Sequence, residues 1–255
     1  MVAPRRPPPR WVVAERRRIL RELGVRRRSS QDEALRSYLG SPVPVLGVQS
    51  PVLRKVAHAA ARRLEAVPAT EARALVRSLG RGRWFEERLV AFELLARPPM
   101  ANGALAWRLG TRWVDGASGW ALSDTLASGP LASAVAARPE RFRELLRWTR
   151  SENLWRRRAS TYALRAWVRA GELDRPFHLL ERLLDDPERW VQRAVGTWLR
   201  ECWKKDRART ERFLRREVRR LAPVTITVAT ERAPKRFREE LRARASGRRP
   251  GRRGY

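Results

Sequence analysis

The sequence predicts an all-α protein: a curved solenoid of stacked helix pairs with a concave basic groove. Tryptophan recurs at Trp84, Trp120, Trp155 and Trp190, spaced 36, 35 and 35 residues apart, which is the period of a two-helix repeat. Between turns marked by Pro, Gly or Asp, apolar residues recur at three- and four-residue spacings, as amphipathic helices require. Because one such pair cannot bury its apolar face alone, consecutive pairs must stack, with the second helices lining the concave side.

These spacings predict helices, in chain order, over residues 11–23, 51–66, 69–79, 84–96, 103–109, 120–126, 139–148, 153–170, 176–184, 187–203 and 208–221. Consecutive helices then pair over residues 102–126, 139–170, 174–203 and 208–245. Two stretches do not fit a helix. Residues 41–49 (SPVPVLGVQ) are apolar and interrupted by Pro, which predicts a buried loop or extended segment. Residues 223–228 (PVTITV) are β-branched, but they lack an evident strand partner.

The domain organisation is predicted to be one solenoid domain over residues 11–245, flanked by two flexible basic arms. The arms, residues 1–10 and 246–255, are rich in Pro, Gly and Arg, a composition that does not build a core. No apolar run has the length of a signal peptide or of a membrane span. We therefore expect a cytoplasmic monomer without membrane contact.

The charge balance points to a polyanionic partner. The chain carries 57 Lys and Arg against 27 Asp and Glu, a formal net charge of +30, and a regular array of phosphates is what so many guanidinium groups can neutralise. A high-GC genome, which inflates Arg and Ala, is the alternative explanation. The single cysteine, Cys202, excludes an intramolecular disulfide, and His58 and His178 stand alone, so no metal site and no cofactor are expected.

One repeat carries a carboxylate at an unexpected position. The residues one helical turn after the four Trp are, in order, Arg88, Asp124, Ala159 and Ala194. A salt bridge from Asp124 to one of the many arginines is the simple explanation, and such surface pairs contribute about 0–1 kcal/mol. However, a carboxylate in a phosphate-binding groove opposes the main source of affinity. Stabilisation of a positive charge is the compensating role that this residue suggests.

Residues three or four apart share one side of a helix, so Asp124 lies with Trp120, and two further Trp-led helices each present an arginine, Arg158 and Arg193. Indoles and guanidinium groups together can hold a phosphate backbone and stack on a base. Trp at a repeat-defined position is also a common core residue, and we expect Trp84 and Trp155 to be core. Trp120 is easier to expose, because small residues precede and follow it.

Four segments together resemble the bacterial DNA alkylation repair glycosylases of the AlkD type. The segments are residues 38–55 (YLGSPVPVLGVQSPVLRK), 119–127 (GWALSDTLA), 151–159 (SENLWRRRA) and 191–201 (VQRAVGTWLRE). They occur in the family's order, and the resemblance spans roughly residues 30–225. It implies a HEAT-like α-solenoid that excises cationic alkylated purines, such as N3-methyladenine and N7-methylguanine, from duplex DNA without metal, cofactor or base flipping.

The resemblance also implies roles for single residues. The family's catalytic Asp falls on Asp124 and the Trp one turn earlier on Trp120. The arginine that holds the DNA backbone near the lesion falls on Arg158, an aromatic of the lesion-facing repeat on Trp190, and an N-terminal Tyr contact on Tyr38.

Arg54, Arg193 and Thr197 complete the expected DNA-binding set. Thr197 occupies the place of the family's second active-site Trp, and the indole is displaced to Trp198, which a helix rotates by about 100°. This departure bears on substrate range and on activity itself.

The sequence thus favours a glycosylase for cationic alkylated purines in duplex DNA, acting in base excision repair. Asp124 would stabilise an oxocarbenium-like sugar and orient water, while Trp120 offers a π face. The first alternative is a non-catalytic DNA-binding solenoid that recognises damaged or branched DNA, and the second is a protein-interaction scaffold. The preferred lesion, the acceptance of bulky adducts and the role of residues 223–228 are not predicted.

Overall fold

The computed structural model describes residues 9–24, 32–100 and 103–247, and it is helical without strands over these ranges. The predicted all-α class is confirmed. Contacts divide the chain into two compact units, residues 1–137 and 138–255, and the single domain over residues 11–245 stays a prediction. The arms predicted to be flexible fall mostly outside the described residues. Within the described ranges, no helix combines the length and the apolar character that a membrane span needs.

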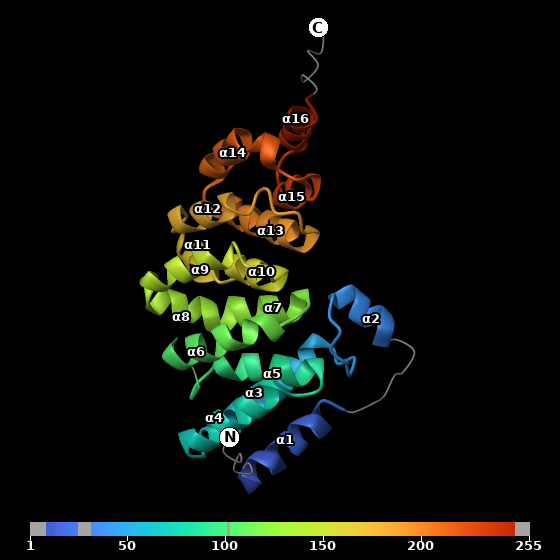
Figure 1. Cartoon of the computed structure of the whole chain (residues 1–255), viewed down its shortest axis with the longest axis vertical. Coiled ribbons are helices and arrows are strands. Elements are labelled where there is room, and N and C mark those ends of the chain that lie inside the picture. Colours follow the sequence, from blue (N-terminus) through green and yellow to red (C-terminus); the bar gives the residue numbers. More distant parts are fainter. Residues whose placement is uncertain (1–8, 25–31, 101–102, 248–255) are drawn as a thin grey trace. The chain divides into compact units, whose positions relative to one another are not determined.

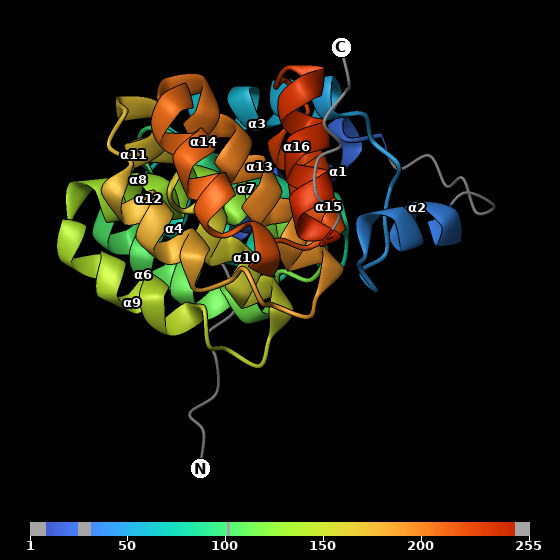
Figure 2. The same ribbon diagram turned by 90° about the horizontal axis from the view of Figure 1, so that it is seen from above.

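Unit 1 (Figure 1) contains α1 (Arg10–Glu22), α2 (Asp32–Leu39), α3 (Ser50–Leu64), α4 (Ala69–Gly80), α5 (Phe85–Leu95), α6 (Gly103–Trp113), η1 (Val114–Gly116), α7 (Trp120–Leu126), η2 (Ala127–Leu131) and α8 (Ala132–Ala137). Helix α5 packs between α3 and α7 and also against α4, while α6 packs on η2 and α8. Fully buried leucines such as Leu75, Leu94 and Leu122 fill the space between these helices. Figures 1 and 2 agree that α2 lies on the side of unit 1 away from α4, α6 and α8.

Helices α7 and α8 are joined without a loop, because η2 is a π-helical turn. Pro130 lies inside this turn. Proline has no N–H and its ring clashes with the preceding turn of an α-helix, so the wider π turn accommodates it. Turns of this kind are frequent at functional sites, and this one begins three residues after Asp124.

Unit 2 contains η3 (Pro139–Arg141), α9 (Phe142–Trp148), α10 (Leu154–Tyr162), α11 (Arg165–Ala170), α12 (Asp174–Glu181), α13 (Arg189–Lys205), α14 (Arg207–Arg216), η4 (Val218–Arg220), α15 (Pro223–Ala229) and α16 (Lys235–Ala245). Helix α13 is central, because α10, α12, α14 and α15 all pack against it. Its buried side presents Val195, Leu199 and Cys202 to these neighbours.

Two expectations about secondary structure are wrong. The helix expected over residues 153–170 is two helices, α10 and α11, separated by a turn at Ala163 and Leu164. Residues 223–228, which the sequence marks as non-helical, form α15, because tertiary contacts outweigh the preference of β-branched residues. By contrast, residues 41–49 form the expected non-helical segment.

Contacts with α13 hold α15 in place. Thr225 is fully buried and its hydroxyl Oγ1 donates to Gln192 Oε1 at 2.6 Å. Gly196 lets α15 approach closely, since a Cβ at this position would lie 2.8 Å from Val228 Cβ and 3.0 Å from the carbonyl oxygen of Thr225. These contacts exist only in the folded unit, which is why the local sequence does not predict the helix.

Candidate functional site

The candidate catalytic pair lies on α7. Trp120 is the first residue of this helix and Asp124 follows one turn later, and both side chains are half-buried. Another side of the helix, formed by Leu122, Ser123 and Leu126, is buried. The pair therefore shares a partly accessible helix side, as the sequence predicts.

Tyr38 meets Trp120 although 82 residues separate them. The indole Nε1 of Trp120 donates to the carbonyl oxygen of Tyr38 at 2.9 Å, and the two rings pack edge to face with centroids 5.6 Å apart. Tyr38 remains 66% exposed, so it is available to an outside ligand. Two residues that the sequence analysis assigned to one site are thus adjacent in unit 1.

Gly119 makes this contact possible. It has a φ of +97°, and a Cβ there would lie 2.7 Å from the carbonyl oxygen of Leu39 and 2.7 Å from Ser41 Cβ. A side chain at residue 119 would thus separate the start of α7 from the end of α2. The close approach and the positive φ together explain why the GWALSDTLA segment begins with glycine.

The loop of residues 41–49 is anchored by Glu86, which is 3% exposed and lies in the first turn of α5. Its carboxylate accepts hydrogen bonds from the backbone N–H groups of Leu46 at 2.8 Å, Gly47 at 3.0 Å and Val48 at 3.2 Å. This loop connects α2, which carries Tyr38, to α3. By anchoring the loop, Glu86 helps to hold Tyr38 in place. The sequence analysis missed it, although two adjacent acids, Glu86 and Glu87, in so basic a chain were the available signal.

The second half of the expected set lies in unit 2, where Arg158 and Trp155 share α10. The expectation that Trp84 and Trp155 are core is wrong, since both are half-buried. The indole of Trp155 packs on Trp190 with ring centroids 5.9 Å apart. Arg158 is instead only 5% exposed. Its guanidinium donates to the carbonyl oxygen of Trp190 and, at 3.2 Å, to the hydroxyl oxygen of Tyr162. These hydrogen bonds compensate the desolvation of the cation and orient it.

Helix α13 carries Trp190, Arg193 and Thr197, and these residues lie on one side at helical spacing. Trp190 and Thr197 are half-buried and Arg193 is exposed. Thr197 Oγ1 donates to the carbonyl oxygen of Arg193 at 2.9 Å. The neighbouring Trp198 is 5% exposed and packs edge to face on Tyr162, with centroids 5.5 Å apart. The displaced indole therefore belongs to the core of unit 2, and a threonine stands at the more accessible position.

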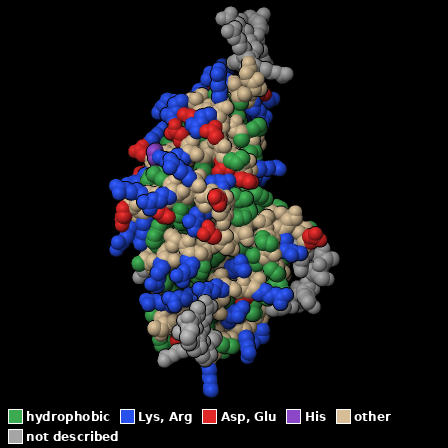
Figure 3. All heavy atoms as spheres, in the orientation of Figure 1, with side chains coloured by type: hydrophobic (Ala, Val, Ile, Leu, Met, Phe, Trp, Pro, Cys, Tyr) green, Lys and Arg blue, Asp and Glu red, His purple; other side chains and the backbone are tan. Residues whose placement is uncertain are grey.

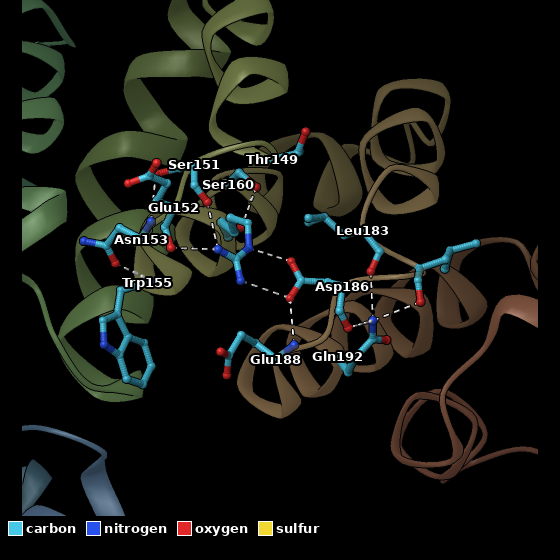
Figure 4. A network of polar contacts seen from close by, with 12 residues as sticks. Thr149, Ser151, Glu152, Asn153, Trp155, Ser160, Leu183, Asp186, Glu188 and Gln192 are labelled. Carbon is cyan, nitrogen blue, oxygen red and sulfur yellow. Dashed lines mark hydrogen bonds and ion pairs between the residues drawn. The ribbon is translucent and has the colours of Figure 1, made fainter.

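A buried polar network fixes α10 against α13 (Figure 4). Arg157 Nε donates to Asp186 Oδ2 at 2.6 Å, and its Nη1 donates to the carbonyl oxygens of Ser151 and Glu152. The Nε2 atom of Gln192, on α13, donates to three carbonyl oxygens, those of Leu183, Leu184 and Asp186. The Arg157–Asp186 pair has side-chain exposures of 12% and 4%. Sequence reasoning assigned no role to Arg157, whose position beside Arg158 hid its structural function.

The remaining expected contact, Arg54, lies exposed on α3 of unit 1. Unit 1 therefore supplies Tyr38, Arg54, Trp120 and Asp124, and unit 2 supplies Arg158, Trp190, Arg193 and Thr197. The structure brings Tyr38 to Trp120 and Arg158 to Trp190. The functional roles of these residues stay predictions.

Comparison with known proteins identifies a family. Residues 19–233 match the family model described as DNA alkylation repair enzyme. Among solved structures, the chain is similar to a "Predicted DNA alkylation repair enzyme from Enterococcus faecalis", with a TM-score of 0.64 and 16% identity over 84% of this chain and 99% of that one. A search of curated protein sequences finds no match.

A second similar structure is AlkD2 from Streptococcus mutans, with a TM-score of 0.54 and 16% identity over 72% of this chain and 89% of that one. A third, smu.31 from Streptococcus mutans UA159, has a TM-score of 0.53 and 16% identity over 79% and 89% of the two chains. At this identity the likeness establishes the fold alone.

Proposed function

Because this chain belongs to the DNA alkylation repair enzyme family, we propose that it is a DNA glycosylase that hydrolyses the N-glycosidic bond of cationic alkylated purines in duplex DNA. The substrates are of the N3-methyladenine and N7-methylguanine class. The observation that carries the proposal is the arrangement of an exposed Tyr38, a half-buried Trp120 and a carboxylate, Asp124, one turn further along α7.

The chemistry follows from the charge of the substrate. An alkylated purine is already cationic, so it leaves with the electrons of the C1′–N bond and becomes neutral without being protonated. The sugar becomes an oxocarbenium-like cation, which the carboxylate of Asp124 stabilises. Water then adds to C1′ and gives its proton to Asp124 or to solvent. A neutral purine requires an acid to protonate the leaving base, and this mechanism supplies none, so such bases should be poor substrates.

The aromatic residues supply binding surface. Trp120 offers a π face to a cationic base or sugar, an attraction of about 0.5–2 kcal/mol that grows as water is excluded. Its ring is held in orientation by the hydrogen bond to the carbonyl oxygen of Tyr38. Trp190 serves as a second aromatic surface. Because the side chain of Thr197 is smaller than an indole, it leaves more space beside Trp190.

The cationic residues hold the DNA backbone. Arg54 and Arg193 are exposed and bind phosphates directly, which positions the duplex without reading its sequence. The guanidinium of Arg158 is held in one orientation by hydrogen bonds to the carbonyl oxygen of Trp190 and the hydroxyl oxygen of Tyr162. It therefore needs little reordering to meet a phosphate. We propose that the protein acts on duplex DNA as a monomer.

The decisive experiment measures release of free base from N7-methylguanine duplex DNA by the Asp124→Asn variant. Release should fall at least about 100-fold, equivalent to about 2.7 kcal/mol of transition-state stabilisation. Duplex affinity should stay equal or rise, because a repulsion toward phosphate is removed. Asp115→Asn, which changes an exposed acid in the same unit, is the matched control and should release base like the parent. Equal release by Asp124→Asn and the parent would show that Asp124 has no catalytic role.

A non-catalytic protein that binds damaged or branched DNA is the second candidate, and one observation favours it. Thr197 leaves an accessible position without the aromatic ring, while Trp198 is buried. If the parent protein binds duplex DNA in a salt-dependent way but releases no base, this second function replaces the first. Both functions rest on phosphate contacts, so raising the salt from 50 to 200 mM should lower the affinity for duplex DNA by several orders of magnitude. An affinity that does not change over this range would contradict both.

A further inference from the structure

A cluster of four arginines lies on unit 1, on helices that do not carry the candidate site. Arg77, Arg81, Arg108 and Arg112, with Leu109, line a hollow of about 430 Å³ between α4 and α6. All four arginines are exposed, and we call them the α4–α6 arginine cluster. Figures 1 and 2 place α4 and α6 on the side of unit 1 away from α2, which carries Tyr38.

The cluster is not neutralised by the rest of the chain. No Asp or Glu lines the hollow, and none of the four arginines forms an ion pair with a residue that the structure describes. Elsewhere arginines are matched: Arg215 pairs with Glu240, and Arg220 pairs with Asp185 and Glu217. In Figure 3 a band of Lys and Arg side chains crosses the face of unit 1 near α4 and α6.

The backbone holds the two pairs of arginines in register. Arg108 and Arg112 are separated by one turn, about 6 Å along α6, and Arg77 lies in the last turn of α4 with Arg81 directly after its end. The ends of α4 and α6 are in tight contact, because a Cβ on Gly80 would lie 2.7 Å from the ring of Trp113. Four cations therefore lie around one hollow, and a bound anion would relieve their mutual repulsion.

The lining also limits which anion fits. No aromatic ring lines the hollow, so its walls favour phosphate groups over the base of a free nucleotide. Guanidinium groups match phosphate oxygens in a bidentate manner, and an open, exposed hollow admits a continuous backbone. We propose that the α4–α6 arginine cluster is a second binding surface for the phosphodiester backbone of duplex DNA, separate from the candidate site, so that one chain can hold two DNA segments.

The test is the stoichiometry of binding of a short duplex, measured by native mass spectrometry and titration calorimetry. The parent should bind two duplexes per chain, and a variant with Arg77→Ser and Arg112→Ser should bind one. Between 50 and 200 mM salt, the affinity of the second site should fall about 100-fold if four phosphates are contacted. The salt dependence of the one duplex that the variant still binds should match that of the candidate site in the parent.

The control removes the same amount of charge from α1, with Arg17→Ser and Arg21→Ser, two exposed arginines. It should leave the stoichiometry at two. If the control variant also bound only one duplex, the effect would be due to net charge, and the proposal would be overturned. Binding of inorganic tripolyphosphate at the cluster without a second duplex would also overturn it.

The experiment separates this surface from the candidate site. If the parent binds one duplex and the cluster variant none, the cluster stands and the duplex-binding role of the candidate site fails. If the parent and the cluster variant bind equally, the cluster has no such role, whatever the candidate site does. Thermal unfolding of both variants checks that the exposed substitutions leave the fold intact.

Discussion

Gly119→Ala should destabilise the chain by disrupting the contact between α2 and α7. The backbone of Gly119 has φ +97° and ψ +148°, a region that is nearly restricted to glycine, and forcing another residue into it costs about 1–3 kcal/mol. The new Cβ would also lie 2.7 Å from the carbonyl oxygen of Leu39 and 2.7 Å from Ser41 Cβ. Overpacking of this kind costs a further 1–3 kcal/mol, roughly. The expected loss is therefore about 2–6 kcal/mol.

Thermal unfolding and base release measure the two consequences. A loss of 2 kcal/mol or more lowers the melting temperature by at least about 4 °C in a chain of this size. Because the displaced start of α7 carries Trp120, base release should fall together with stability. Gly116→Ala is the matched control, since its φ is not positive and its Cβ would meet nothing within 4 Å. If Gly119→Ala melted with Gly116→Ala and the parent, the close approach would not constrain the site.

Three further predictions concern glutamates and the single cysteine. Glu86→Ala should lose about 2–5 kcal/mol of unfolding free energy in urea, because three backbone N–H groups lose a charged acceptor; a loss below 1 kcal/mol would contradict its anchoring role. Burial raises the pKa of Cys202 to about 12, so a thiol reagent at pH 8 should label it only after unfolding, and rapid labelling of the native chain would refute this. Hydrogen bonds from arginine lower the pKa of Glu240, and they outweigh the effect of burial to lower that of Glu217 as well. Their stabilisation is present above the ordinary value of 4.5 and is lost as pH falls through the lower folded pKa values, so Glu240→Gln should flatten the acid limb of a stability curve.

The helices that the sequence predicts correctly are those whose apolar spacing is sufficient by itself. Helix α13 is an example, since its buried residues recur at three and four positions over 17 residues. The sequence fails where a contact from another element decides the outcome. Residues 223–228 are helical because Thr225 reaches Gln192 and Val228 fits over Gly196, and neither partner can be recognised within that segment.

The candidate site shows the same division. The repeat of Trp and the lone acid at Asp124 could be found from spacing, and the resemblance supplied Tyr38, Arg158 and Trp190. The burial of the side chains was not predictable, because Trp155 and Arg158 lie three residues apart and only their partners distinguish them. Arg158 can be buried because the carbonyl oxygen of Trp190 and the hydroxyl oxygen of Tyr162 accept its hydrogen bonds, and no spacing rule anticipates those acceptors.

The same reasoning applies to the net charge of +30, which indicates a polyanionic partner but not where it binds. Arg157 forms a buried ion pair with Asp186, and Arg215 and Arg220 form ion pairs with Glu240 and Asp185. These cations add to the number of basic residues, but their charge is already neutralised within the protein. The α4–α6 arginine cluster has no such acid in its lining. Pairing, rather than number, therefore decides which basic residues can release counterions from DNA, and pairing requires the positions of both side chains.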